Sequence, residues 1–405
     1  MPSFGASPFK ARLEYYEESA TRGPLDEGTP SSFARVLGAL CFTAGLVLLI
    51  VSGEAFVGLA GHILAGSYAA EGLSTEVAIV LRALMLLILS ALLTATGLAL
   101  AYNRRRLAAS LTHAALLTIF LAAVCDVMVD GISWRIVPLV GAQVLAVVAQ
   151  ALIDPTLSEE RRVQRELRKL ELREEAEEGV LGRDPTGRGY IRFDFFNLFW
   201  IFVVASVLGL LFENTFHELY YHGYQNRVGL LFGPFSPIYG LGAVLMTLAL
   251  NRLHSGSVLV IFFASAVIGG TFEYLTSWFM ELAFGVTAWD YTGMWLSIGG
   301  RTCGLYMAVW GVLGVLWVKL LLPLVLRVVN LIPWKWRYAI TGVCALLMLV
   351  DVVMTLQALD CWYERVSGTS PHSGIQRFYA AHFDDAYMQH RFQSMLIQPG
   401  SAARG

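Results

Sequence analysis

Long apolar runs, separated by short polar segments, follow one another along most of the chain. About 20 consecutive apolar residues in a helix cross the roughly 30 Å of hydrocarbon in a bilayer. We therefore predict an all-α polytopic membrane protein with about nine transmembrane helices, four before a charged break and five after it. The apolar runs lie at about 36–57, 77–101, 107–129, 133–153, 195–214, 230–252, 257–283, 302–327 and 338–358.

Polar stretches separate these runs into regions. Residues 1–32 mix Glu with Arg and lack an apolar core, so they are not a cleavable signal peptide. The break at 154–194 is dense in charges of both signs, and Val163, Leu167 and Leu170 have helical spacing. This pattern predicts an amphipathic helix that is solvated or docks a partner. The predicted regions are an N-terminal tail (1–32), a four-helix module (33–153), a charged linker (154–194), a five-helix core (195–358) and a C-terminal tail (359–405).

The stretch GPFSPIYGLG at 233–242 interrupts one of the apolar runs. Because proline removes a backbone donor and glycine loosens a helix, a continuous transmembrane helix cannot pass through it. The remaining helical residues, 238–250, are too few to span. A broken or re-entrant helix often lines a binding site, whereas the alternative is a kinked helix after a proline-rich turn. The residues of such a gate are Gly233, Pro234, Pro237, Tyr239 and Gly240.

Lys and Arg gather in the loops on one side of the predicted helices. Arg104, Arg105 and Arg106 follow the second run, and the charged linker follows the fourth. Since cytoplasmic loops are enriched in Lys and Arg, this side is predicted to be cytoplasmic. The chain is then a multi-pass protein of the cell membrane, with its N-terminus in the cytoplasm and its C-terminal tail outside. The same side carries Arg252, Arg327, Lys335 and Arg337, whereas the tail has basic residues of its own at Arg365, Arg377 and Arg391.

Ionisable residues gather near the outer ends of the five-helix core. Steps of four residues place Glu273, Ser277 and Glu281 on one face of a helix. A carboxylate deep within a span is costly unless it is paired, so Glu273 marks a candidate site. We expect an outward-facing polar pocket, in which Arg301 at the start of a helix favours an anionic group. Its candidate binding residues are Glu213, Arg227, Glu273, Glu281, Asp290 and Arg301.

The alternative interpretation of Glu273 is structural. Its carboxylate would pair with Arg301 or Arg227 and only tie helices together. Two other carboxylates within apolar runs, Asp126 and Asp351, are interpreted as structural, although Asp351 has no evident partner in the sequence. The two interpretations of Glu273 therefore differ in the group that its carboxylate contacts.

The composition agrees with a membrane protein and narrows its chemistry. The 405 residues are 56% hydrophobic and 15% charged, whereas soluble domains carry about 25% charged residues. A net charge of -2 gives no sign of nucleic acid binding. The chain has no GxxxxGKS or GxxxxGKT phosphate loop and no GxSxG nucleophile, and the histidines of HELYYH at 217–222 point in different directions on a helix. We therefore favour a protein that is not an enzyme, and expect no cofactor and no metal.

Cys303 and Cys361 fall at the outer ends of the last two predicted helices. A short turn joins these helices, so they should pack antiparallel and bring their outer ends together. A disulfide then becomes feasible outside the cell if the two Cα atoms lie within about 7 Å. The alternative is that Cys303 packs beneath Arg301 and that Cys361 is a free, solvent-exposed thiol.

Three segments and the C-terminal tail together resemble a known family. They are NRVGLLFGPFSPIYGLGAV (226–244), EYLTSWFMELAFGVTAWDY (273–291), GRTCGLYMAVWGVLG (300–314) and RFYAAHFDDAYMQHRF (377–392). In this order they resemble the ABC-transporter permeases of the CmpB type, over residues 195–395. The resemblance implies a transport permease that works with a separate ATPase subunit. After the linker the cytoplasmic loops are short, so only 154–194 offers a docking segment, and it precedes the region of resemblance.

Three functions are compatible with these observations. The first is a permease-like protein that binds a small polar or anionic solute at Glu213, Arg227, Glu273 and Arg301, with the broken segment as its gate. The second is a polytopic membrane enzyme that acts on a lipid or lipid-linked substrate at the outer leaflet. In that enzyme Glu273 or Glu213 would be the general acid or base, and an arginine would hold a phosphate. The third is a membrane anchor or assembly subunit that binds no ligand. The expected partners are the lipid bilayer and, through 154–194, a separate ATPase subunit or another membrane protein.

Overall fold

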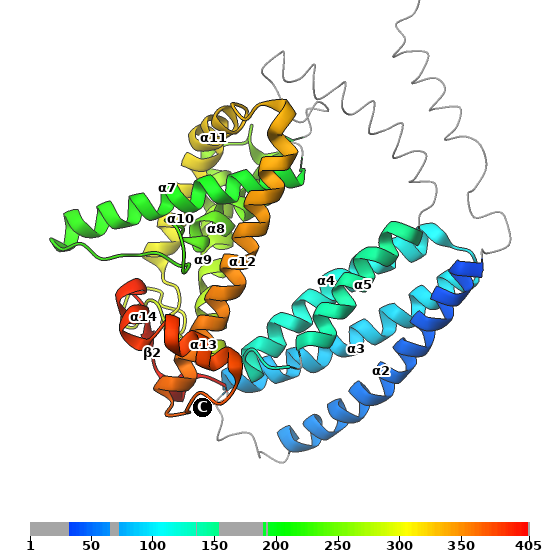
Figure 1. Ribbon diagram of the computed structural model, residues 1–405. Helices are drawn as coiled ribbons and strands as arrows, with labels where there is room; N and C mark the ends of the chain where they lie inside the picture. The colour runs from blue at the N-terminus through cyan, green and yellow to red at the C-terminus, as the bar shows by residue number, and fades with distance from the viewer. Residues whose placement is uncertain (1–31, 65–72, 135, 154–188, 192, 404–405) are drawn as a thin grey trace, which may run out of the picture. The chain divides into compact units, whose positions relative to one another are not determined.

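The computed structural model describes residues 32–64, 73–134, 136–153, 189–191 and 193–403. These residues are mostly helical (Figure 1), which agrees with the predicted all-α class. The chain separates into two compact units, one formed by Met1–Asp126 and Trp134–Arg162, the other by Val127–Ser133 and Val163–Gly405. The predicted N-terminal tail and most of the predicted charged linker lie outside the described residues, so their structure stays a prediction.

The first unit is built from apolar helices that pack through small residues. A Cβ atom at Gly97 would clash with Phe42 of the facing helix, and one at Gly45 would clash with Thr94. Such small residues let two helix backbones approach closely. The unit's helices are α2 (Ser32–Leu64), α3 (Leu73–Ala101), α4 (Arg105–Asp130) and α5 (Ile136–Ile153).

An ion pair joins α3 to α4. Arg82 Nη1 lies 3.5 Å from Asp126 Oδ1, and both side chains are largely buried. A carboxylate within an apolar helix is costly without such a partner. The contact agrees with the structural role predicted for Asp126.

The second unit carries all the candidate site residues, and short polar signals set the ends of its helices. Asp194 caps α7, because its Oδ1 accepts a hydrogen bond from the backbone N–H of Asn197 at 2.7 Å. Gly285 ends α9 with a φ of 59°, a conformation that glycine adopts without strain. The elements are α7 (Phe195–Tyr221), α8 (Pro237–Leu250), η1 (Asn251–Leu253), α9 (Val258–Phe284), β1 (Val286–Thr287), α10 (Gly304–Leu316), η2 (Trp317–Leu321), α11 (Leu322–Val329) and α12 (Trp334–Val366).

Glycines bring α9 and α10 into close contact. A Cβ atom at Gly269 would clash with the Trp310 ring, and one at Gly270 would approach Met307 Cγ to 2.6 Å. Large side chains of α10 therefore lie directly on the backbone of α9. Glu273 lies one turn further along α9, so these glycines also set how close Glu273 lies to α10.

The C-terminal tail folds onto one end of the second unit. Its elements are α13 (Gly374–His382), α14 (Asp385–Arg391), β2 (Leu396–Ile397) and η3 (Pro399–Ser401). Strand β2 pairs antiparallel with β1, with Val286 opposite Ile397. Arg365, near the end of α12, donates to Asp385 Oδ1 at 2.7 Å and to the Phe383 carbonyl at 2.9 Å. These contacts hold the tail against the ends of α9 and α12.

Among the described residues, six helices are long and apolar enough to cross a membrane. Shorter apolar stretches lie at Ala34–Ile50 within α2, at Ile136–Val147 within α5 and at Pro237–Leu253 across α8 and η1. This pattern supports the predicted multi-pass membrane class, while the count of nine transmembrane helices stays a prediction. The six are Ser74–Ala101, Leu107–Asp130, Phe195–Leu219, Val258–Phe284, Gly304–Val329 and Trp336–Val366.

Cys303 and Cys361 are free thiols, so the disulfide that their positions suggested is not formed. Both residues are buried, with exposed fractions of 0% and 2%. Cys303 Sγ lies 4.0 Å from Met294 Sδ, and Cys361 Sγ accepts a hydrogen bond from Gln357 Nε2 at 3.7 Å. The solvent-exposed Cys361 of the alternative interpretation is therefore wrong as well.

Candidate functional site

The chain between α7 and α8 is not helical, and α8 begins only at Pro237. Proline suits this first helical position because its missing N–H would have no partner there in any case. The proline-rich part of 233–242 is thus a turn that leads into α8. The first residues of the predicted apolar run at 230–252 are therefore not helical. That the turn lies at membrane depth stays a prediction.

Glycines fit the start of α8 against α7. A Cβ atom at Gly240 would lie 2.6 Å from the Phe202 carbonyl oxygen, and one at Gly209 would clash with the Tyr239 ring. Close backbone contact requires residues without a side chain at both positions. Gly209 and Gly240 thus both lie in the contact between α7 and α8.

Helix α12 satisfies part of the backbone of the non-helical segment. The N–H of Leu231 donates to Thr355 Oγ1 at 2.9 Å, and the N–H of Phe232 donates to Asp351 Oδ1 at 3.2 Å. Non-helical backbone in an apolar surrounding needs such partners, because water does not supply them. Asp351, which has no partner evident in the sequence, therefore accepts a hydrogen bond from this backbone.

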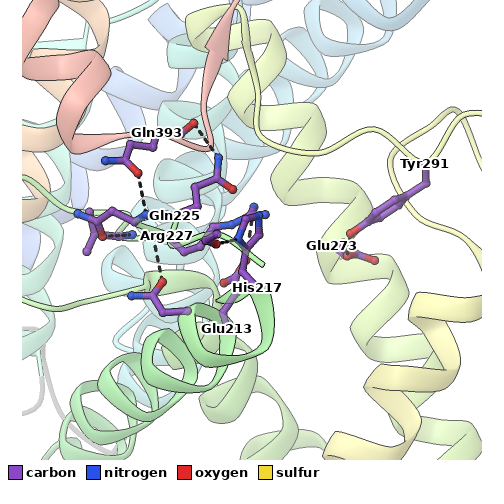
Figure 2. Close-up of polar contacts among 11 residues, drawn as sticks. Glu213, His217, Gln225, Arg227, Glu273, Tyr291 and Gln393 are labelled. Atoms are coloured by element: carbon purple, nitrogen blue, oxygen red, sulfur yellow. Dashed lines mark hydrogen bonds and ion pairs between the residues drawn. The ribbon is translucent and has the colours of Figure 1, made fainter. Parts of the chain in front are cut away.

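The C-terminal tail holds the other side of the same segment. Arg391 donates through Nε to the Leu230 carbonyl at 3.0 Å and through Nη2 to the Gly233 carbonyl at 2.6 Å. Gln393 accepts from the N–H of Asn226 at 2.9 Å, and its own carbonyl accepts from Gln225 Nε2 at 3.0 Å (Figure 2). The contact between the tail and the predicted gate is not predicted by the sequence.

A first group of polar side chains lies where α7 ends. Arg227 Nη1 is 3.7 Å from Glu213 Oε1, and the Arg227 N–H donates to Asn214 Oδ1 at 3.2 Å. The Tyr239 hydroxyl interacts with the Glu213 carboxylate from the first turn of α8. His217 Nδ1 contacts the Gly223 carbonyl at 2.8 Å. This group joins α7, the following loop and α8.

A second ion pair joins α9 to the loop before α10. Arg301 Nη2 lies 2.5 Å from Glu281 Oε2, and the guanidinium lies over the Tyr274 ring at 5.6 Å. The Arg301 carbonyl also accepts from Trp289 Nε1 at 2.9 Å. Both residues were expected in the site, and the structure makes them partners of each other.

Asp290 organises the same loop. Its Oδ1 accepts from the hydroxyl of Thr292 at 2.6 Å and from the Thr292 N–H at 2.8 Å. These hydrogen bonds hold the pKa of the Asp290 carboxyl below its ordinary value. The contacts place Asp290 in a local turn, where the residue is exposed.

Glu273 is held by neutral side chains of the described residues, two hydroxyl groups and the indole of Trp310. Its side chain is buried, with 5% exposure, and it accepts from the Tyr291 hydroxyl at 3.0 Å and from Thr302 Oγ1 at 3.0 Å. The Tyr291 ring stacks on Tyr306 at a centroid distance of 4.3 Å. Burial raises the pKa of Tyr291 above its ordinary value, and the neighbouring Glu273 adds to the shift.

Neither arginine pairs with Glu273, so the ion pair that the structural interpretation predicts for this residue is wrong. Arg301 is bound to Glu281 and Arg227 to Glu213. Figure 2 shows the Glu273–Tyr291 pair apart from the group around Glu213 and Arg227. The six predicted residues are therefore divided between two ion pairs, the turn at Asp290 and the separately held Glu273, and their union in one pocket stays a prediction.

Two partners of Glu273 were not selected from the sequence, although the signal was present. Tyr291 directly follows Asp290, and Thr302 directly follows Arg301, within motifs that the resemblance already covered. Arg391 and Gln393 lie in or beside the tail motif, but only the fold brings them to the segment between α7 and α8.

Comparison with known proteins agrees with the resemblance found in the sequence. Residues 200–356 match the family described as "Putative ABC-transporter type IV". The matched part includes the segment before α8, both ion pairs and Glu273, whereas the tail motif at 377–392 lies outside it. No curated protein and no solved structure matches the chain.

Proposed function

We propose that this protein is a permease-like membrane protein that binds a small polar or anionic solute beside its two arginine–carboxylate pairs. The match to a transporter family supports transport over a lipid-directed enzyme. The proposed orientation puts both pairs, and the tail, on the outer side of the cell membrane, since Arg252 and the basic residues after α11 lie at the other end of the unit's helices.

The observation that carries the proposal is unused donor capacity on both arginines. Arg227 Nε and Arg301 Nε are buried and have no hydrogen-bond partner among the described residues. The Arg227–Glu213 distance of 3.7 Å is also too long for a strong hydrogen bond. A guanidinium has five N–H donors, and carboxylate or phosphate oxygens are its best acceptors. An anionic group of the solute would therefore satisfy donors that the carboxylates leave open.

The segment 228–240 is the proposed gate, since it links the Arg227 group to α12 and the tail. Tyr239 contacts Glu213 from the first turn of α8, and Arg391 holds the backbone of Gly233. Movement of the segment would change the surroundings of the Arg227–Glu213 pair. A separate ATPase subunit, if it docks at 154–194, would act from the other side of the membrane.

A binding experiment on the full chain in lipid nanodiscs tests this function. Thermal unfolding is measured with a panel of small anions that includes phosphate, sulfate, dicarboxylates and acidic amino acids. A ligand at 100 times its dissociation constant stabilises the folded state by about 2.7 kcal/mol, so binding is visible as a raised midpoint. We expect one class of anion to raise the midpoint of the wild type.

Substitution then locates the bound anion. Arg227→Gln and Arg301→Gln should each abolish the rise, because each removes a guanidinium that donates to the anion. Arg252→Gln is the matched control, since Arg252 is exposed at the opposite end of α8 and should leave the rise intact. The proposal fails if no anion stabilises the wild type, or if Arg227→Gln and Arg301→Gln both respond as the wild type does.

A further inference from the structure

Glu273 differs from the other carboxylates of the site in the kind of partner it has. Glu213 and Glu281 each face a guanidinium, whereas the partners of Glu273 among the described residues are neutral: the hydroxyls of Tyr291 and Thr302 and the indole of Trp310. It is 5% exposed. A buried carboxylate with no cation beside it is strongly disfavoured in its ionised form and tends to take up a proton.

The groups that face Glu273 from the neighbouring elements are neutral aromatic and hydroxyl side chains. Tyr239 approaches from α8, Tyr291 and Thr302 from the loop before α10, and Trp310 from α10 itself. The charged groups on the elements around it have other partners. Arg301 is bound to Glu281, Arg227 to Glu213, and Asp351 of α12 to the backbone of Phe232.

The two hydroxyls allow Glu273 to be satisfied in either protonation state. Ionised, the carboxylate accepts a hydrogen bond from each hydroxyl, as in the structure. Protonated, its own O–H donates to one of them, because a tyrosine or threonine hydroxyl is an acceptor as well as a donor. A guanidinium offers no such choice, since it has no acceptor.

We infer that Glu273 is a proton-binding site, whose carboxyl group is oriented by the hydroxyls of Tyr291 and Thr302 in both protonation states. A hydronium ion transfers its proton to the carboxylate, which gives the carboxylic acid and a water molecule, and no other reactant is needed. Tyr291 and Thr302 are positioning residues that orient the carboxyl group. The inference adds a proton to the ligands of the proposed site. Proton binding by Glu273 is independent of the proposed function, and only the coupling of the proton to a solute rests on it.

Infrared difference spectroscopy on the full chain in nanodiscs, without any solute, tests proton binding directly. Spectra are recorded between acidic and alkaline pH, in water and in heavy water. We expect a carbonyl band of a protonated carboxyl group that disappears as the pH rises and shifts in heavy water. Glu273→Gln should remove this band, whereas Glu218→Gln, at an exposed glutamate of α7, should keep it.

A second variant protects the test against misfolding of Glu273→Gln. Tyr291→Phe keeps the ring that stacks on Tyr306 and removes one hydroxyl from Glu273. The band should then shift in frequency and in midpoint. The inference is overturned if Glu273→Gln folds and keeps the band, if the wild-type band does not titrate, or if Tyr291→Phe leaves it unchanged. These outcomes do not depend on solute binding. Failure of the proposed function would appear in the thermal unfolding experiment with anions and not in these spectra.

Discussion

Arg391 donates to the backbone carbonyl of Gly233 at 2.6 Å, across 158 positions of sequence. Gly233 has a φ of 66°, in the left-handed region that favours glycine. The same guanidinium binds the carbonyl of Leu230 at 3.0 Å. One side chain of the tail thus holds the turn that precedes α8 at two points.

Loss of this side chain should loosen the turn. Arg391→Ala leaves two carbonyls without their charged donor, and loss of the partner of the buried Leu230 carbonyl costs about 1–3 kcal/mol, whereas water can reach the exposed Gly233. Because about 1.4 kcal/mol corresponds to a tenfold change, amide hydrogen exchange at 228–236 should accelerate about tenfold or more. Arg377→Ala is the matched control, since Arg377 is an exposed arginine of the same tail. Equal exchange in the two variants would show that the tail does not hold the turn.

The pairing of the arginines predicts which double substitutions interact. Arg301→Gln and Glu281→Gln remove two sides of one ion pair, so their combined loss of stability should be smaller than the sum, by about 0.5–3 kcal/mol. Arg301→Gln and Glu273→Gln should be nearly additive, because these side chains have different partners. Chemical denaturation in detergent micelles measures both cycles. Coupling of Arg301 to Glu273 instead of Glu281 would contradict the observed pairing.

Two glycines in the second unit should respond differently to alanine. Gly240→Ala places a Cβ atom 2.6 Å from the Phe202 carbonyl oxygen, so α7 and α8 must separate, and overpacking of this kind costs about 1–3 kcal/mol. Gly342→Ala meets no atom within 4 Å and lies within α12, where alanine is favoured over glycine by about 1 kcal/mol. Thermal unfolding should show a lowered midpoint for the first variant and an unchanged or raised midpoint for the second.

The sequence predicts the helical class and the break before α8 well, because both depend on local composition. Apolar runs fix the helices, and proline with glycine fixes where α8 begins. It also selects Glu213, Arg227, Glu273, Glu281 and Arg301, since ionisable residues are rare in such runs. Apolar composition alone predicts one continuous helix at 230–252, whereas this run contains a turn followed by a short helix.

The partners of these residues could not be predicted from the sequence. Arg301 and Arg227 are equally plausible partners for Glu273 by position, and only the rotation of α9 and the path of the loop decide that Arg301 meets Glu281. Asp351 finds its partner in the backbone of Phe232, which no side-chain pattern reveals. Long-range contacts of this kind depend on tertiary packing, as does the burial of Cys361 that excludes a solvent-exposed thiol.

The orientation of the second unit can be tested with two cysteines at opposite ends of its helices. Trp295 is 74% exposed in the loop before α10, and Arg252 is exposed after α8. In a background with serine at the native cysteines, an impermeant thiol reagent should label Trp295→Cys on intact cells. Arg252→Cys should be labelled only after the cells are permeabilised, because basic residues mark the cytoplasmic side. The reversed pattern would place Glu273, both ion pairs and the C-terminal tail on the cytoplasmic side, and would exclude an outward-facing solute site.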